Sequence, residues 1–357
     1  MQTGQFLRYF QGQKNFKKII GILNAPPGEK IHLKGLIGSA KTILLANLFR
    51  KSSKIFTILL NDKEEAAYFY DDLNNLGLAE STLFFPSSFK RSIHYGQTEQ
   101  ENIVQRTEVL NKIWLNEKPY IIVSYPEAIV ETVISQAALK TNTLWVKKGD
   151  KISTDFLNEF LYEYGFERVE YVYEPGQFSV RGSIVDVFSF SNEDPYRLDF
   201  FGDEVETIRS FNIDNQISKA SLENITIVPN IQNKDIESSR LSFVSFFQTE
   251  NIWFGNNLNQ FFAHVTDIHR QTILDKASEK NIQYEIVTSQ ALKSEMAQNT
   301  VFEMDTDLAF EPTTHFEFSN SKQPIFNKNF ELLGENLSEF SKNGYEVFIL
   351  SEPGKAD

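Results

Sequence analysis

Gly35, Lys41 and Thr42, in the stretch "GLIGSAKTILLANLFR", have the residue types and spacing of a phosphate-binding loop. In such a loop, backbone N–H groups surround the β-phosphate, the lysine reaches the terminal phosphates, and the hydroxyl binds Mg²⁺ at a helix N-terminus. Ala40 stands where the second glycine should be, so its Cβ lies where the backbone must approach the ligand closely. The stretch predicts a degenerate loop, with simple nucleotide binding as the alternative.

Hydrolysis of a nucleotide also requires a carboxylate at the end of an apolar strand, to position Mg²⁺ and water. The candidate strand, "YIIVS" (120–124), continues through Tyr125 and Pro126 before it reaches Glu127. Glu127 is a poor match because of this proline. We therefore expect no catalytic residues.

Metal ligands are not apparent in the sequence. There is no cysteine, and the five histidines are scattered. His264 and His269 are five residues apart, whereas a metal pair on one helix face needs a spacing of three or four. We expect no metal site and no cofactor.

An arginine among aromatic residues is the notable feature of the middle of the chain. The segment "YEPGQFSVRGSIVDVFSF" (173–190) places Arg181 near Phe178 and Phe188, a composition found in protein-interface hot spots. Alternatively, Arg181 pairs with a nearby carboxylate such as Asp186 or Asp199. The spacing does not decide between these two roles.

The composition indicates an ordinary globular protein that does not bind nucleic acid non-specifically. A length of 357 residues suggests two or three domains of about 150 residues each. A net charge of −13 argues against non-specific binding of a phosphate backbone by this chain. No apolar run has the length of a signal peptide or a membrane span, so we expect a cytoplasmic protein without membrane contact.

Three segments must position these residues. Strand and helix patterns alternate through residues 1–141, as in a parallel sheet covered by helices. Residues 142–212 are β-rich. The α/β alternation returns in residues 213–357, which suggests one discontinuous α/β domain with the β-rich segment inserted into it.

Individual elements are also predicted. Ser153 or Thr154 should cap a helix, and Gly202-Asp203 should form a hairpin turn, although a strict register would place Asp199 opposite Glu206. The third segment should contain strands at 225–229, 251–255 and 284–287 and a helix at 265–281. The final residues, 327–357, predict a helix followed by a strand, as in a piece of a longer protein.

The segment "EPGQFSVRGSIVDVFSF…PYRLDFFGDEVETIRSFN" closely resembles the signature shared by bacterial transcription-repair coupling factors and the excinuclease component UvrB. The likeness spans the whole chain. It implies a helicase-like parallel α/β domain with a degenerate phosphate loop and an inserted β-rich α+β domain like that of UvrB. The break at Ala40, and the lack of room for a DNA-clamping hairpin in "FFPSSFKRSIHYGQTEQENIVQRTEVL", favour the coupling factors, with UvrB as the alternative.

The resemblance further implies that the inserted domain binds the excinuclease component UvrA through arginine and aromatic residues. Carried onto this sequence, these positions are Arg168, Arg181, Phe188, Arg197 and Phe178, with Arg168 expected to join Arg181 in one patch. ATP and Mg²⁺, double-stranded DNA and RNA polymerase would be bound by domains of the parent protein that lie outside this chain. This chain itself is expected to be a docking module without enzymatic activity.

Overall fold

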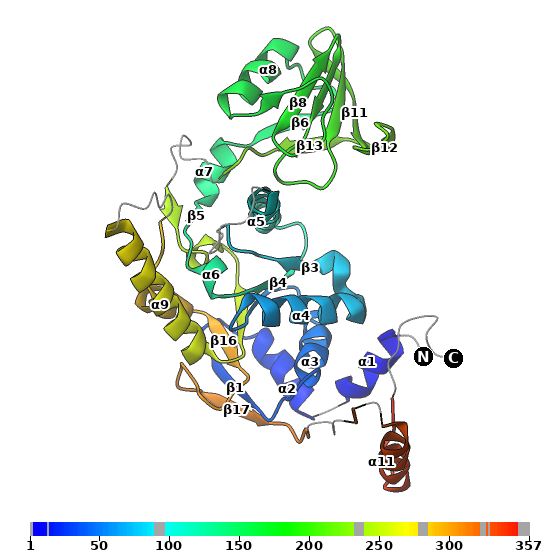
Figure 1. Ribbon diagram of the computed structural model, residues 1–357, viewed down its shortest axis with the longest axis vertical. Coiled ribbons are helices and arrows are strands. Elements are labelled where there is room, and N and C mark those ends of the chain that lie inside the picture. Colours follow the sequence, from blue (N-terminus) through cyan, green and yellow to red (C-terminus); the bar gives the residue numbers. More distant parts are fainter. Residues whose placement is uncertain are drawn as a thin grey trace. The chain divides into compact units, whose positions relative to one another are not determined.

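The computed structural model describes residues 3–12, 14–88, 97–231, 239–277, 285–321, 326–327 and 329–348 (Figure 1). The chain divides into two compact units, Met1–Ser319 and Asn320–Asp357. The second unit contains the helix α11 (Phe330–Lys342). No helix in the described part of the chain is long and apolar enough to cross a membrane.

Seven parallel strands of the described residues form the sheet of the α/β domain, in the order β17-β1-β16-β15-β2-β4-β3. Their bounds are β1 (Lys30–Lys34), β2 (Ile55–Leu59), β3 (Thr82–Phe84), β4 (Ile121–Ser124), β15 (Asn251–Gly255), β16 (Thr300–Glu303) and β17 (Thr314–Glu317). β15 and β16, from the third segment, lie between β1 and β2 from the first. The chain therefore leaves this sheet for the inserted domain and then returns to it.

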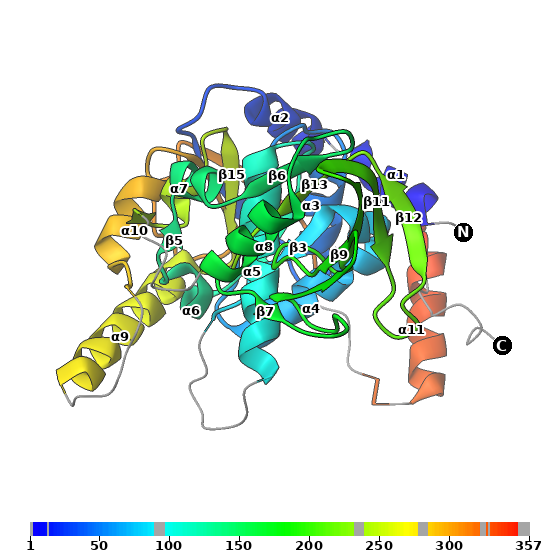
Figure 2. The same cartoon turned by 90° about the horizontal axis from the view of Figure 1, so that it is seen from above.

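Helices cover both sides of this sheet. In Figures 1 and 2, α3 and α4 lie on one side and α9 lies on the other. The helix bounds are α1 (Thr3–Gln11), α2 (Lys14–Leu23), α3 (Ala40–Phe49), α4 (Lys63–Leu73), α5 (Gln97–Leu115), α6 (Pro126–Ile129), α7 (Gln136–Thr141), α9 (Leu258–Ala277) and α10 (Ser289–Met296). The apolar run of β2 is buried along its whole length, as expected for a central parallel strand.

The inserted domain, residues 144–227, has its own six-stranded sheet in the order β12-β11-β10-β9-β8-β7. The strands of this sheet are β7 (Glu167–Arg168), β8 (Gln177–Arg181), β9 (Ile184–Val187), β10 (Tyr196–Phe201), β11 (Glu204–Phe211) and β12 (Ser218–Leu222). Two further strands of the domain, β6 (Leu144–Lys147) and β13 (Asn224–Ile227), form a separate two-stranded sheet. The helix α8 (Thr154–Glu163) buries Leu157 and Leu161 in the core beneath this sheet. Ser153 caps α8 by accepting a hydrogen bond from the backbone N–H of Phe156, as predicted.

The C-terminal boundary predicted for the inserted domain, residue 212, is too early. β12 extends the sheet next to β11, and β13 pairs with β6. Ile225 and Ile227 also belong to the core of the inserted domain. The strand predicted at 225–229 therefore completes this domain, because its apolar side chains fill the core beneath the sheet and not the α/β core.

Other predicted elements differ in extent. The helix expected at 265–281 begins earlier, at Leu258, and residues 278–281 lie outside the described residues. The strand expected at 284–287 is only an isolated bridge between Ile286 and Glu131, with Tyr284 outside the described residues. After α11, residues 345–348 form no strand, and residues 349–357 are outside the described part.

The predicted hairpin joins β10 to β11. Gly202 takes a φ of +61°, a left-handed conformation that glycine adopts without steric cost. The register shifts between Asp199 and Phe200, so that Asp199 lies opposite Thr207 and not opposite Glu206. This β-bulge keeps two carboxylates from facing each other.

Candidate functional site

In the segment that resembles a phosphate loop, residues 35–42, two backbone N–H groups donate to carbonyl oxygens of the same segment. The N–H groups of Ala40 and Lys41 donate to the carbonyl oxygens of Ile37 and Gly38, each at 3.2 Å. In a working loop, such N–H groups point at the phosphate. A Cβ added to Gly35, whose φ is +86°, would lie 2.2 Å from the carbonyl oxygen of Phe318. Gly35 is therefore needed for the packing of the protein's own backbone, because any other residue would clash with Phe318.

The side chain of Lys41 is also engaged within the protein. Its ammonium donates to Oδ1 of Asn256, and Nδ2 of Asn256 donates to Oε1 of Glu65 at 2.6 Å. Asn256 directly follows β15, so the strand that reaches the loop lysine ends in a neutral amide where a Mg²⁺-positioning carboxylate would be needed. These residues do not fit a bound magnesium nucleotide.

The strand considered from the sequence for this carboxylate is the wrong one. β4 is separated from β1 by β16, β15 and β2. Glu127, which follows β4, lies in α6 and contacts Nε2 of His264 at 3.3 Å. Strand order decides which strand end meets the loop, and strand order does not follow from the local sequence.

No group of three or more histidine or acidic side chains in the described part of the chain could hold a metal ion. Among the histidines that the structure describes, His32 on β1 and His315 on β17 lie close together, with their Nδ1 atoms 3.2 Å apart. His94 lies outside the described residues.

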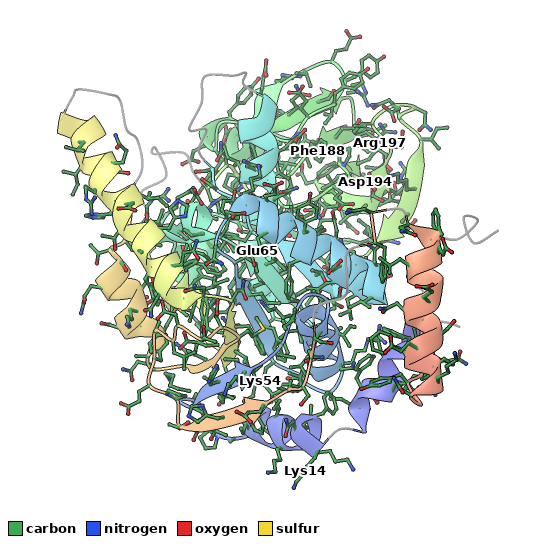
Figure 3. All side chains as sticks on the ribbon, turned by 60° about the horizontal axis from the view of Figure 1, so that its bottom comes forward. Lys14, Lys54, Glu65, Phe188, Asp194 and Arg197 are labelled. Carbon is green, nitrogen blue, oxygen red and sulfur yellow. The ribbon has the colours of Figure 1, made fainter. Side chains whose placement is uncertain are left out.

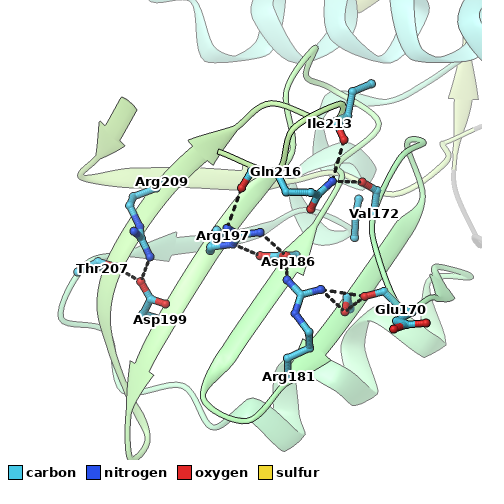
Figure 4. Close-up of polar contacts among 11 residues, drawn as sticks. Glu170, Val172, Arg181, Asp186, Arg197, Asp199, Thr207, Arg209, Ile213 and Gln216 are labelled. Atoms are coloured by element: carbon cyan, nitrogen blue, oxygen red, sulfur yellow. Dashed lines mark hydrogen bonds and ion pairs between the residues drawn. The ribbon is translucent and has the colours of Figure 1, made fainter. Parts of the chain in front are cut away.

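Two arginines share one buried carboxylate on the sheet of the inserted domain (Figure 4). Asp186, on β9, is completely buried. Its oxygens accept from Nε and Nη2 of Arg197 at 2.7 and 2.8 Å, and from Nη2 of Arg181 at 2.5 Å. Two guanidinium groups against one carboxylate leave this cluster with an excess of one positive charge.

Aromatic rings and backbone oxygens hold the two guanidinium groups in place. That of Arg197 lies 4.5 Å from the ring centre of Phe211, and that of Arg181 lies 5.2 Å from the ring centre of Tyr171. Arg181 also donates to the carbonyl oxygen of Glu170 at 2.8 Å. The hydrogen bonds to Asp186 raise the pKa of Arg197 above its usual value. Arg181 keeps 35% of its side chain exposed against 15% for Arg197, so Arg181 is the more available to a partner.

A second ion pair extends this surface. Asp199, on β10, accepts hydrogen bonds from Arg209 and from the hydroxyl of Thr207. We call the surface formed by Arg181, Asp186, Arg197, Asp199 and Arg209 the arginine face. It lies on the opposite side of the sheet from the core, because side chains alternate along each strand and the residues between these positions fill the core.

The structure separates the predicted partner-binding residues. Arg181 and Arg197 lie together on the arginine face (Figure 4). Phe188 is buried with Val172 and Phe211, and Figure 3 labels it together with Arg197 on the inserted domain. Phe178 is completely buried in the core and meets the ring of Tyr162, so it cannot contact a partner in this conformation. The number of aromatic residues in the segment 173–190 could not show which of their rings lie in the core of the inserted domain.

Arg168 does not join Arg181 in one patch. β7 pairs in parallel with β8, with Arg168 opposite Phe178. Residues opposite each other on neighbouring strands point to the same side of a sheet. Arg168 is therefore exposed on the other side of the sheet from the arginine face.

Sequence reasoning missed Tyr171, Arg209 and Asn256. A signal for the arginine face was available in "SIVDVFSF", since a carboxylate inside an apolar strand must be paired when it is buried. The pairing of Arg181 with Asp186, one of the two roles left open above, is present in the structure.

Comparison with known protein families finds a match for the inserted domain. Residues 144–232 match the family described as the UvrB interaction domain. The chain contains a UvrB interaction domain. The matched residues run past β13, which agrees with the later boundary found in the fold.

Curated relatives confirm the resemblance seen in the sequence. The transcription-repair-coupling factor of Bacillus subtilis is 31% identical over 222 residues, which cover 62% of this chain and 19% of that protein. Those of Escherichia coli and Haemophilus influenzae are each 27% identical, covering 57% and 69% of this chain and 17% and 21% of the relatives. The match spans about a fifth of the length of these relatives.

Proposed function

We propose that this chain is a docking module that recruits nucleotide excision repair by binding the excinuclease component UvrA. The observation that carries this proposal is the arginine face on a UvrB interaction domain. Its excess positive charge would favour an acidic surface on the partner, and Tyr171, which is 45% exposed, offers an aromatic contact beside Arg181.

The α/β domain acts, in this proposal, as a helicase-like scaffold without ATPase activity. The hydrogen bonds within residues 35–42 and the contact between Lys41 and Asn256 support this role. In the parent protein, a DNA translocase acting in the cytoplasm, other domains would bind ATP, Mg²⁺, double-stranded DNA and RNA polymerase. The relatives' name, transcription-repair-coupling factor, supports this assignment.

Calorimetric titration of this chain with UvrA, in nucleotide-free buffer, tests the proposal. We expect binding by the wild type and a loss of at least about tenfold in affinity for Arg181→Ala, since a charge-assisted contact contributes about 1.5 kcal/mol or more. Arg270→Ala is the matched control, because it removes an exposed arginine from α9. Absence of binding by the wild type, or equal weakening by both variants, would overturn the proposal.

Arg168→Ala decides how far the contact extends. If UvrA covers only the arginine face, this variant binds like the wild type, because Arg168 lies on the other side of the sheet. A loss comparable to that of Arg181→Ala would mean that the partner wraps around the β7 edge.

A further inference from the structure

A pocket of about 630 Å³ lies where the inserted domain meets the α/β domain within the first unit. Its walls come from α4, the segment 79–84, α5 and two parts of the inserted domain, residues 174–175 and 188–193. Pockets of this size are typical of ligand sites. None of the residues of the arginine face lines it, so the pocket is a separate feature.

The helix α5 fixes the two domains around this pocket. Ile103 and Val104 of α5 pack against the core of the inserted domain, and Trp114 of α5 meets Trp145 of β6 with ring centres 5.5 Å apart. α5 also contacts β3 of the parallel sheet. Figure 1 shows α5 between β6 and β3.

The wall of the pocket combines apolar and polar side chains, and its charged side chains are mostly acidic. Apolar side chains are supplied by Leu83, Phe84, Val104, Val109, Pro175 and Phe188. Five glutamates lie around them, and their positions are Glu80, Glu101, Glu108, Glu174 and Glu193. Lys112 is the basic side chain among the described lining residues, and it pairs with Glu108.

This combination matches the chemistry of lysine and arginine side chains. Such side chains bury their aliphatic stems on apolar surface while they keep the charged group in a polar environment. Tyr70 and Phe84, whose rings are 5.7 Å apart, add aromatic surface on which a cation is attracted. A carboxylate ligand or a nucleic-acid phosphate would instead be repelled by the glutamates.

We propose that this pocket is a docking site for a basic segment of a partner protein, whose lysine or arginine side chains enter between the glutamates of α5 and those of the inserted domain. The proposal goes beyond the docking of UvrA, because the pocket and the arginine face have opposite charge. It assigns two surfaces of different specificity to the same inserted domain.

Fluorescence anisotropy with a short fluorescein-labelled peptide that alternates lysine and alanine tests this docking site. We expect the wild-type chain to bind it, and the double variant Glu101→Gln/Glu193→Gln to bind at least about tenfold more weakly. The control pair is Glu64→Gln/Glu159→Gln, which removes the same charge from exposed positions on α4 and α8 outside the pocket. Equal weakening by the two pairs would overturn the proposal, since it would mean attraction by the overall negative charge.

A steric variant tests the pocket itself. Ala79 is exposed and lines the pocket, so Ala79→Trp fills it without changing any charge. We expect this variant to lose the peptide as well, and unchanged binding would contradict a pocket site. Spermine binding as tightly as the peptide would overturn the assignment to a protein segment. Arg181→Ala should bind the peptide like the wild type, so failure of this proposal and failure of the arginine face can be told apart.

Discussion

The guanidinium group of Arg197 donates two hydrogen bonds to the buried carboxylate of Asp186, at 2.7 and 2.8 Å. This bidentate pair fixes the carboxylate on β9, and Arg181 binds the same carboxylate from the neighbouring strand β8. Asp186 is therefore a positioning residue for both arginines, although it does not reach the surface itself.

Asp186→Asn should destabilise the chain by about 3 kcal/mol, since removing one partner of a buried ion pair leaves the other charges uncompensated. Urea unfolding of the two proteins measures this difference. Asp194→Asn is the control, because Asp194 pairs with Lys219 at the surface and should cost less than about 1 kcal/mol. Similar losses for both variants would show that Asp186 does not organise the arginine face.

Glu131→Gln should loosen the attachment of α5 to the α/β domain. Glu131 accepts hydrogen bonds from Ser87 and Ser88 and pairs with the completely buried Arg106 of α5 at 3.2 Å. Burial lowers the pKa of Arg106, but an arginine stays charged in a protein. Removing the carboxylate therefore leaves a buried cation, at a cost of about 3 kcal/mol in the free energy of unfolding.

Hydrogen exchange of α5 measures the same change locally, and faster exchange than in the wild type is expected. Glu64→Gln, an exposed change on α4, should leave both the stability and the exchange of α5 unaltered. An unchanged free energy of unfolding in Glu131→Gln would contradict this role of the buried pair.

Lys41→Met and Asn256→Ala should each cost about 1 kcal/mol, the usual net contribution of a hydrogen bond in a protein. The double variant should cost less than the sum, because both changes remove the same contact. Denaturant unfolding of the four proteins gives this coupling. Adding ATP with Mg²⁺ should not raise the melting temperature of the wild type, and a rise that disappears in Lys41→Met would show a working phosphate loop.

Acid should weaken the edge of the parallel sheet through His32. Burial lowers the pKa of His32 below its usual value of 6.5, and the neighbouring His315 and Lys34 act in the same direction, whereas Asp305 opposes them. Between the folded pKa and 6.5, the unfolded chain binds more protons than the folded chain, so stability is lost as the pH falls below about 6.5.

Urea unfolding between about pH 7.5 and 5.5 measures this loss, and His32→Gln should show a smaller decrease in stability than the wild type. The variant removes the titrating ring, and the contributions of groups that do not contact it cancel in the comparison. The same decrease in both proteins would exclude His32 as its source.

Local sequence determined much of the architecture. Apolar runs such as that of β2, the cap at Ser153 and the turn at Gly202 act within a few residues, so their pattern predicts the elements correctly. The motif around Arg181 indicated the family because it is a continuous stretch of specific residues. Ala40 likewise predicted a degenerate phosphate loop.

The tertiary structure decided everything that depends on which strands become neighbours. Strand order brings Asn256 into contact with Lys41. The parallel pairing of β7 with β8 places Arg168 on the opposite side of the sheet from Arg181. The pairing of β13 with β6 extends the inserted domain beyond residue 212. The burial of Phe178 was decided in the same way. These contacts join residues far apart in the chain, and their free energy comes from packing and charge pairing that no local spacing encodes.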